Sequence, residues 1–176
     1  MHSSNFGDLQ PDIQPLGLVS DFVNEFIEAV GPQHIFDSFS RQETTMLSEY
    51  LDCFGVPRDS TVLREGDDSD FIAILITGKA VILKTRDDVN ATVQDISPGQ
   101  IVGVMSFIDR QKRFASCVTT EPCDFAVLTR DSLDAMLADH PRLGNKFLLM
   151  LLGLTASRLR QATTFMMPGL NDLQAE

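Results

Sequence analysis

The strongest constraint on the fold is a change of pattern between residues 53 and 130. About eight short runs rich in β-branched and aromatic residues follow one another there: F-G-V-P, S-T-V-L-R, F-I-A-I-L-I-T, A-V-I-L-K-T, A-T-V-Q-D-I, Q-I-V-G, A-S-C-V-T-T and D-F-A-V-L-T. Turn-forming residues such as Gly66, Gly78 and Pro98-Gly99 separate the runs. Short strands spaced by about 8–12 residues are typical of a sandwich or a jelly roll. We therefore expect a mainly β fold with flanking helices, built on a double-stranded β-helix (jelly-roll) barrel.

Helical patterns lie on both sides of these runs. Apolar residues recur at helical spacing from Val19 to Val30, and Ser40 with Glu43 forms a capping-box pattern before a second helix. Helical spacing returns near Asp131, pauses before Pro141 and continues to about residue 167. The sequence thus predicts a flexible N-terminal arm (1–18), N-terminal helices (19–52), the β-barrel (53–130), C-terminal helices for hinge and dimerisation (131–167) and a tail (168–176).

The last helix carries two apolar faces. One holds Leu148, Leu152, Thr155, Leu159, Ala162 and Met166, and the neighbouring one holds Phe147, Leu151, Leu154, Arg158 and Phe165. A helix that is apolar on more than one face must be covered from more than one side. One face can pack on the barrel, and the other favours a homodimer through the helix around Leu148–Met166. The alternative is that both faces are buried within one chain.

Charge and apolar content argue against several kinds of partner. The formal net charge is −11 and the sequence pI is about 4.5, so we expect neither nucleic-acid nor anionic-membrane binding. The longest apolar run, Phe147–Leu154, is shorter than the roughly 18 residues of a membrane span. The N-terminus lacks a signal-peptide pattern, so the chain is expected to be cytoplasmic.

Patterns for catalysis or metal binding are missing. His2, His34 and His140 are isolated and lie outside the expected strands, which argues against a cupin-like metal centre. The cysteines show no C-x-x-C spacing, and we expect buried, reduced thiols. The sequence therefore predicts a binding protein with no catalytic or metal residues, not an enzyme.

The stretch Pro98–Val118 carries the clearest functional signal. A short apolar strand leads to Gly103, then to one amphipathic turn of helix and a basic cluster that ends at Arg113. Helix amides and a guanidinium can both engage a phosphate. The three basic residues Arg110, Lys112 and Arg113 suit one small anion better than a duplex. We interpret this stretch as an anion cradle.

The order of these elements resembles the cyclic nucleotide-binding domain, the sensor module of catabolite-activator-type regulators, protein kinase A regulatory subunits and cyclic-nucleotide-gated channels. The matching residues span about 34–162: the turn Glu65-Gly66-Asp67 with Asp70 after it, I-L-I-T-G ending at Gly78, S-P-G-Q-I-V-G ending at Gly103, and R-F-A-S from Arg113 to Ser116. The resemblance implies that cAMP or cGMP, or a related phosphate ligand, binds in the barrel and that the long helix transmits the signal.

The resemblance also implies which residues bind the ligand. The segment from Gly103 matches the family's phosphate-binding cassette, at Gly103, Met105, Ser106, Arg113, Ala115 and Ser116. Arg113 would pair with the cyclic phosphate, and Ser116 would bond the phosphate or the base. In dimeric members the long helix contributes side chains to the purine, a role that Arg158 and Thr163 would take here. The alternative for Arg158 is a solvated or salt-bridged helix residue.

Two residues depart from the family pattern. Val104 stands where the family has the glutamate that accepts the ribose 2′-hydroxyl, and a buried hydroxyl without its acceptor costs about 1–3 kcal/mol. Phe114 replaces a small residue and would fill part of the pocket if it pointed inward, which strand alternation leaves open. The second hypothesis is therefore a scaffold of the same fold that acts by dimerisation or through an unknown protein partner, without nucleotide.

Regulators of the catabolite-activator type continue into a helix-turn-helix domain after the long helix. About ten residues follow that helix here, too few for two helices and a turn. We expect no DNA binding by this chain.

Overall fold

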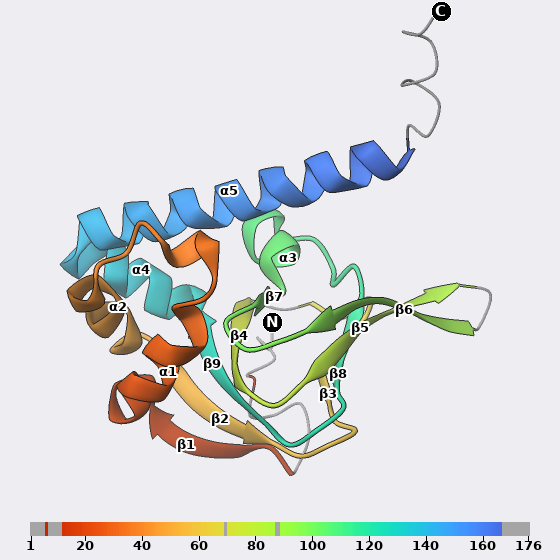
Figure 1. Cartoon of the computed structure of the whole chain (residues 1–176), viewed down its shortest axis with the longest axis horizontal. Coiled ribbons are helices and arrows are strands. Elements are labelled where there is room, and N and C mark those ends of the chain that lie inside the picture. The colour runs from red at the N-terminus through yellow and green to blue at the C-terminus, as the bar shows by residue number, and fades with distance from the viewer. Residues whose placement is uncertain (1–5, 7–11, 69, 87–88, 167–176) are drawn as a thin grey trace, which may run out of the picture.

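The computed structural model describes residue 6 and residues 12–68, 70–86 and 89–166, and within them the strands form two antiparallel sheets (Figure 1). The first sheet has the order β1 (Gln14–Leu18), β2 (Asp52–Val56), β9 (Cys123–Thr129), β4 (Phe71–Thr77) and β7 (Ile101–Val102). The second has the order β3 (Thr61–Leu63), β8 (Ser116–Thr119), β5 (Ala80–Arg86) and β6 (Val89–Ile96). The predicted mainly β jelly-roll class is confirmed, as two facing sheets and not as a closed barrel.

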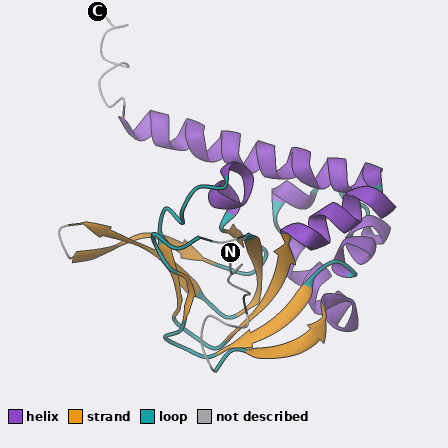
Figure 2. Cartoon of the chain, turned by 180° about the vertical axis from the view of Figure 1, so that it is seen from behind, coloured by secondary structure: helices purple, strands orange, loops and turns teal. Residues whose placement is uncertain are grey.

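Helices gather on the outer side of the five-stranded sheet, and the longest runs across the whole molecule (Figure 2). Two short 3₁₀ segments, η2 (Val19–Phe22) and η3 (His34–Phe36), accompany the N-terminal helices α1 (Val23–Val30) and α2 (Arg41–Ser48). The remaining helices are α3 (Val104–Asp109), α4 (Arg130–Asp139) and α5 (Pro141–Met166). None of the helices within the described residues is long and apolar enough to cross a bilayer.

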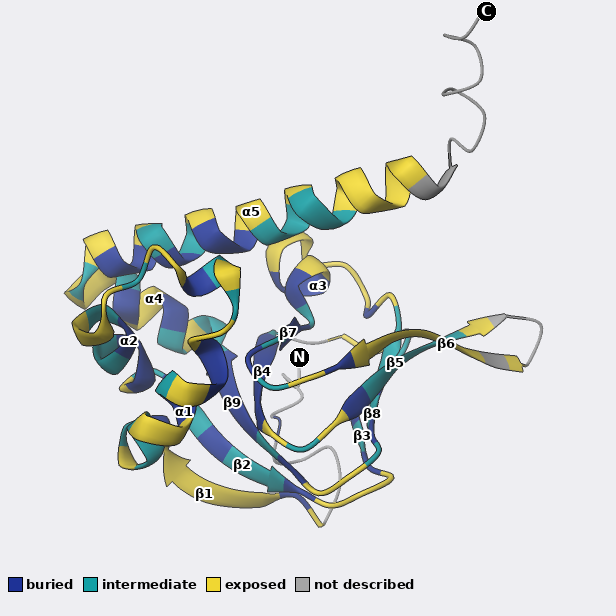
Figure 3. Cartoon of the chain, viewed as in Figure 1, coloured by how far each residue is buried: buried dark blue, intermediate teal, exposed yellow. Residues whose placement is uncertain are grey.

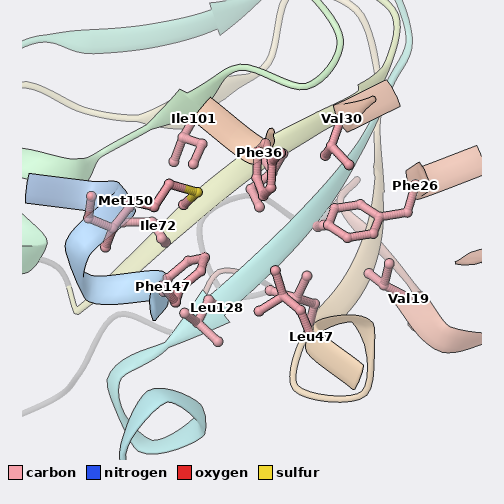
Figure 4. Close-up of a cluster of buried hydrophobic side chains, with 14 of the residues drawn as sticks. Val19, Phe26, Val30, Phe36, Leu47, Ile72, Ile101, Leu128, Phe147 and Met150 are labelled. Atoms are coloured by element: carbon pink, nitrogen blue, oxygen red, sulfur yellow. The ribbon is translucent and has the colours of Figure 1, made fainter. Parts of the chain in front are cut away.

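Strand β4 explains why the fold has two apolar cores. Phe71 and Leu75 point between the sheets, whereas Ile72 and Ile74 point toward the helices, and all four are buried. Because both faces of β4 are covered, its sequence is a continuous apolar run without polar alternation. The helix-side core brings residues of β4 and β9 together with Leu47 of α2 and with α5 (Figure 4).

The N-terminal arm requires a correction. The sequence predicted residues 1–18 as a flexible arm, yet Gln14–Leu18 form β1, which pairs antiparallel with β2. Phe6 is 1% exposed and its ring packs against Phe54, Phe71 and Phe125. All five residues of β1 are exposed, so backbone hydrogen bonding holds this strand and no apolar alternation marks it. Residues 1–5 and 7–11 of the predicted arm, and the tail 168–176, lie outside the described residues.

The predicted capping box at α2 is confirmed. The Ser40 hydroxyl accepts from the Glu43 amide at 3.2 Å, and the Glu43 carboxylate accepts from the Ser40 amide at 2.8 Å. That carboxylate also accepts from Lys146 Nζ at 2.7 Å, so the cap ties α2 to α5. The Lys146 bond, followed by the Ser40 amide, lowers the pKa of Glu43 to about 2.

The two faces of α5 have different environments (Figure 3). Phe147 and Leu151 are fully buried against the fold, and Leu154 and Arg158 are half-buried. The opposite face is open, and its exposed residues follow a 3-4-3-4 spacing: Leu149, Leu152, Ala156, Leu159 and Thr163. This spacing is the apolar repeat of a coiled-coil helix.

Candidate functional site

The cassette begins where β7 turns into α3. Gly103 adopts φ +85° and ψ 8°, a left-handed conformation that residues with a Cβ rarely take. A Cβ at this position would lie 2.5 Å from Nη1 of Arg113 and 3.2 Å from its Cζ. The glycine is therefore needed twice: for the turn, and for the close approach of the guanidinium to the backbone.

The Arg113 side chain points into the fold and is 3% exposed. Its Nη1 donates to the Gly103 carbonyl at 2.7 Å and to the Ser106 hydroxyl at 2.6 Å, and its Nη2 donates to the Phe71 carbonyl at 2.6 Å. The guanidinium carbon lies 4.8 Å from the centroid of the Phe71 ring. These contacts hold the charged fork in one orientation beside the start of α3.

A buried cation is electrostatically costly, and the pKa of Arg113 reflects that cost. Burial lowers this pKa from 12.5 to about 10, while the negative charge of Asp70 acts in the opposite direction. An anion placed against the guanidinium would favour its charged form and would raise this pKa again. Such an anion would therefore stabilise the charged side chain.

Ser106 is the second polar group at this point and is 4% exposed. Its hydroxyl accepts from Arg113, and its donation to the Gly103 carbonyl spans 3.4 Å. That distance is longer than the usual range of roughly 2.5–3.0 Å for such a bond. The hydroxyl hydrogen is therefore only weakly engaged and is available to a better acceptor.

The turn at Glu65-Gly66-Asp67 holds the backbone of Arg113 through hydrogen bonds to both its amide and its carbonyl. The amide of Gly66 donates to the Arg113 carbonyl and the amide of Arg113 donates to the Asp67 carbonyl, each at 2.9 Å. The Ser116 hydroxyl accepts from the Glu65 amide at 2.9 Å. Two motifs about 50 residues apart in the sequence thus meet at one point.

Phe114 does not fill the interior. Its side chain is 60% exposed, and Lys84 Nζ lies 4.2 Å from its ring centroid. The same Nζ donates to the Phe114 carbonyl at 2.6 Å and to the carboxylate of Glu65. The bond from Lys84, followed by that from the Thr85 amide, lowers the pKa of Glu65. The question that strand alternation left open is answered in favour of the outward orientation.

Val104 is 2% exposed and belongs to the helix-side apolar core, together with Phe107. It therefore offers neither an acceptor nor a polar environment at the position where the family has a glutamate. The sequence shows the valine at this position, but its burial in the helix-side core is visible only in the structure.

The structure gathers some of the predicted site residues and separates others. Gly103, Ser106 and Arg113 form one hydrogen-bonded group, and Ala115 and Ser116 follow it, half-buried. Met105 is 50% exposed on α3. The two predicted residues of α5 have other partners: Arg158 donates to the Ile101 carbonyl at 2.9 Å, and the exposed Thr163 donates to Leu159 of its own helix.

Sequence reasoning missed three groups that surround the guanidinium or its strand: Phe71, Lys84 and the carboxylate of Glu65. Glu65 belongs to a matched turn and Phe71 follows Asp70 in the sequence, but neither position indicated these contacts, and no matched motif marked Lys84. Within the described residues, no three His, Cys, Asp or Glu side chains gather in a way that could hold a metal ion.

Comparison with known proteins gives a consistent set of matches. A family model described as the cyclic nucleotide-binding domain matches residues 54–140. The crystal structure of a cyclic nucleotide-binding domain from Methylobacillus flagellatus KT is similar, with a TM-score of 0.82 and 37% identity, and the match covers 96% of each chain.

Two curated relatives are regulators. The CRP-like cAMP-activated global transcriptional regulator of Mycobacterium tuberculosis is 29% identical over 128 residues, which cover 72% of this chain and 55% of that protein. The cAMP-dependent protein kinase regulatory subunit of Aspergillus niger is 28% identical over 103 residues, 58% of this chain and 25% of that protein. The chain spans about half the length of the first of these relatives and a quarter of the second.

Proposed function

Because the chain belongs to the cyclic nucleotide-binding domain family, we propose that it is a regulatory domain that binds a cyclic nucleotide, cAMP or cGMP, with the cyclic phosphate on Arg113. The observation that carries this proposal is the buried guanidinium, held by Gly103 and Ser106 at the turn where the family binds phosphate. The names of both regulators include cAMP, which supports cAMP as the first nucleotide to test.

The chemistry at this point follows from the hydrogen bonds. The planar fork of a guanidinium matches two phosphate oxygens, and charge-assisted bonds of this kind are roughly twice as strong as neutral ones. Because Arg113 donates to Gly103, Ser106 and Phe71 in this structure, a phosphate would have to replace some of these acceptors. The Ser106 hydroxyl can turn its hydrogen from the distant Gly103 carbonyl to a phosphate oxygen. A bound phosphate would offset the burial that now lowers the pKa of Arg113.

The ribose end of the site lacks the carboxylate that the family uses. Val104 lies in an apolar core, so a ribose 2′-hydroxyl would lose an acceptor worth about 1–3 kcal/mol, or one to two decades of affinity. The same observation favours the second hypothesis, a dimerising scaffold of this fold that binds no nucleotide. Because Phe114 is exposed, its ring does not take up space between the sheets, which supports the nucleotide hypothesis.

We propose further that the chain forms a homodimer through α5. The exposed stripe on this helix repeats like a coiled-coil seam, and Leu152 and Leu159 on it are 54% and 68% exposed. The helix packs on α3 and donates from Arg158 to Ile101, two residues before Gly103. A change at the cassette would therefore reach the dimer seam through α3 and α5.

Titration calorimetry with cAMP and with cGMP tests the nucleotide proposal. We expect micromolar binding of at least one nucleotide by the wild type, and a loss of about tenfold or more in Arg113→Lys, which keeps the charge but loses the fork. Arg142→Lys, on an exposed arginine of α5, is the matched control and should bind like the wild type. No heat with either nucleotide, from a chain that still dimerises, would overturn the proposal in favour of the scaffold.

A further inference from the structure

A groove separate from the cassette lies between α5, β7 and the segment that contains η3. Its volume is about 210 Å³. Six of the described residues that line it are polar: Gln33, Gln94, Gln100, Ser157, Arg158 and Gln161. None of the described lining residues is acidic, so Arg158 gives the groove a local positive charge in a chain of net charge −11. Helix α5 and η3 are in contact, so the groove is bounded by packed elements.

The groove and the cassette lie on opposite faces of β7. The Ile101 side chain, which lines the groove, belongs to the helix-side core. The next side chain, Val102, points between the sheets, where Phe71 packs against the Arg113 guanidinium. Because successive residues of a strand point to opposite faces, a ligand in the groove would not be the ligand of Arg113.

Arg158 supplies the charge of the groove. It is half-buried, and burial lowers the pKa of its guanidinium. Within the described part of the chain, its Nη2 donates to the Ile101 carbonyl at 2.9 Å. A guanidinium has five N–H donors. Most of its hydrogen-bonding capacity therefore faces the groove, where no lining carboxylate takes it up.

Two of the glutamine side chains that line the groove are fixed by hydrogen bonds to backbone groups. Gln33 donates through Nε2 to the Pro98 carbonyl at 2.9 Å, which leaves its own carbonyl oxygen for another donor. Gln100 accepts through Oε1 from the Ser97 amide at 2.9 Å, which leaves its NH₂ group. The groove thus presents a cation next to both donors and acceptors. These groups match an acid group attached to an uncharged polar body.

We propose that this groove binds a small polar organic acid, with its acidic group on Arg158 and its neutral polar groups on the glutamine amides. The volume corresponds to roughly seven water molecules at about 30 Å³ each, which limits the ligand to around ten non-hydrogen atoms. Such a ligand would join α5 to the turn that leads into β7. The site goes beyond the nucleotide function and does not depend on it.

Side-chain amide resonances of the glutamines give a direct test on the full chain. Glycerate, N-acetylglycine and inorganic phosphate are titrated into ¹⁵N-labelled protein in the presence of saturating cAMP. We expect at least one of the two organic acids to shift the Gln33 and Gln100 NH₂ signals saturably, with a Kd below about 1 mM and at least tenfold below that of phosphate. Arg158→Gln should weaken this binding by roughly tenfold or more. Arg160→Gln, on an exposed neighbour in the same helix, should leave it unchanged.

Three outcomes would overturn the proposal. One is no saturable shift with either organic acid up to 10 mM, roughly ten times the expected limit. Another is equal affinity for inorganic phosphate, because the amides would then contribute nothing. The third is a loss of binding in Arg113→Gln but not in Arg158→Gln, which would assign the acid to the cassette. Because the nucleotide is tested separately by calorimetry, failure here leaves that proposal unaffected.

Discussion

Replacement of Gly103 by alanine tests how tightly the cassette is built around its arginine. The backbone at Gly103 has φ +85°, and a Cβ would lie 2.5 Å from Arg113 Nη1. The left-handed conformation alone costs a non-glycine residue about 1–2 kcal/mol. The methyl group must also displace the guanidinium and weaken its bonds to Gly103 and Ser106, and a hydrogen bond to a charged group contributes about 1.5–3 kcal/mol. We expect Gly103→Ala to lower the free energy of unfolding by about 3–5 kcal/mol.

Gly66 offers a matched control in the turn that contacts the same arginine. Its φ is +83°, but a Cβ there meets nothing within 4 Å. Gly66→Ala should therefore cost only the backbone strain, about 1–2 kcal/mol. Urea unfolding at one fixed protein concentration measures both variants, since the stability of the proposed dimer would depend on concentration. If Gly103→Ala is no more destabilising than Gly66→Ala, the guanidinium does not pack as described.

Three other expectations concern the core, the helix cap and the dimer seam. Val104→Glu should destabilise the chain more at pH 8 than at pH 5. Burial among apolar residues raises the pKa of the new carboxyl, so the folded state binds a proton more readily than the unfolded state. Thermal unfolding measures this difference, and a loss of stability that does not depend on pH would contradict the apolar packing of Val104. The pKa of Glu43 is lowered to about 2, so its contribution to stability is present above the ordinary value of 4.5 and is lost as the pH falls toward 2. The stability advantage of the wild type over Glu43→Gln should accordingly shrink between pH 5 and pH 2, and a constant difference in urea unfolding would argue against the Lys146 pairing. Leu152→Glu and Leu159→Glu should each convert a dimer into a monomer in analytical ultracentrifugation. Thr164→Glu, at an exposed position on the flank of the same helix, is the control and should leave the dimer intact. A wild type that sediments as a monomer would refute the α5 dimer.

The elements with strong local patterns were predictable from the sequence. The continuous apolar run of β4, the capping box at Ser40 and the break before Pro141 all arise from residues close together in the chain, and the structure has each of them. Strand β1 was not predictable, because its side chains are exposed and its partner β2 begins more than 30 residues later. A strand held by backbone bonds alone leaves no apolar signature.

In the candidate site, too, the contacts between residues close in the sequence were predictable and the long-range contacts were not. Gly103 and Arg113 are ten residues apart, and the motif that contains them predicted their proximity. The contact between Arg113 and Phe71 spans 42 residues, and the contact between the exposed Phe114 and Lys84 spans 30. Arg158 shows the limit most clearly: its place in the helix was predicted, but its partner is a backbone carbonyl of β7. Long-range contacts of this kind depend on the packing of whole elements and not on a local pattern.

We propose above that Arg113 binds the phosphate of a cyclic nucleotide. A thermodynamic cycle tests it most directly: calorimetry of cAMP and of adenosine, which lacks the phosphate, on the wild type and on Arg113→Gln. We predict that the wild type binds cAMP roughly 10–100 times more tightly than adenosine, the contribution of one or two charge-assisted bonds, and that the variant prefers cAMP by less than about threefold. An equal preference for cAMP in both proteins, or no binding of cAMP by the wild type at millimolar concentration, would contradict the claim.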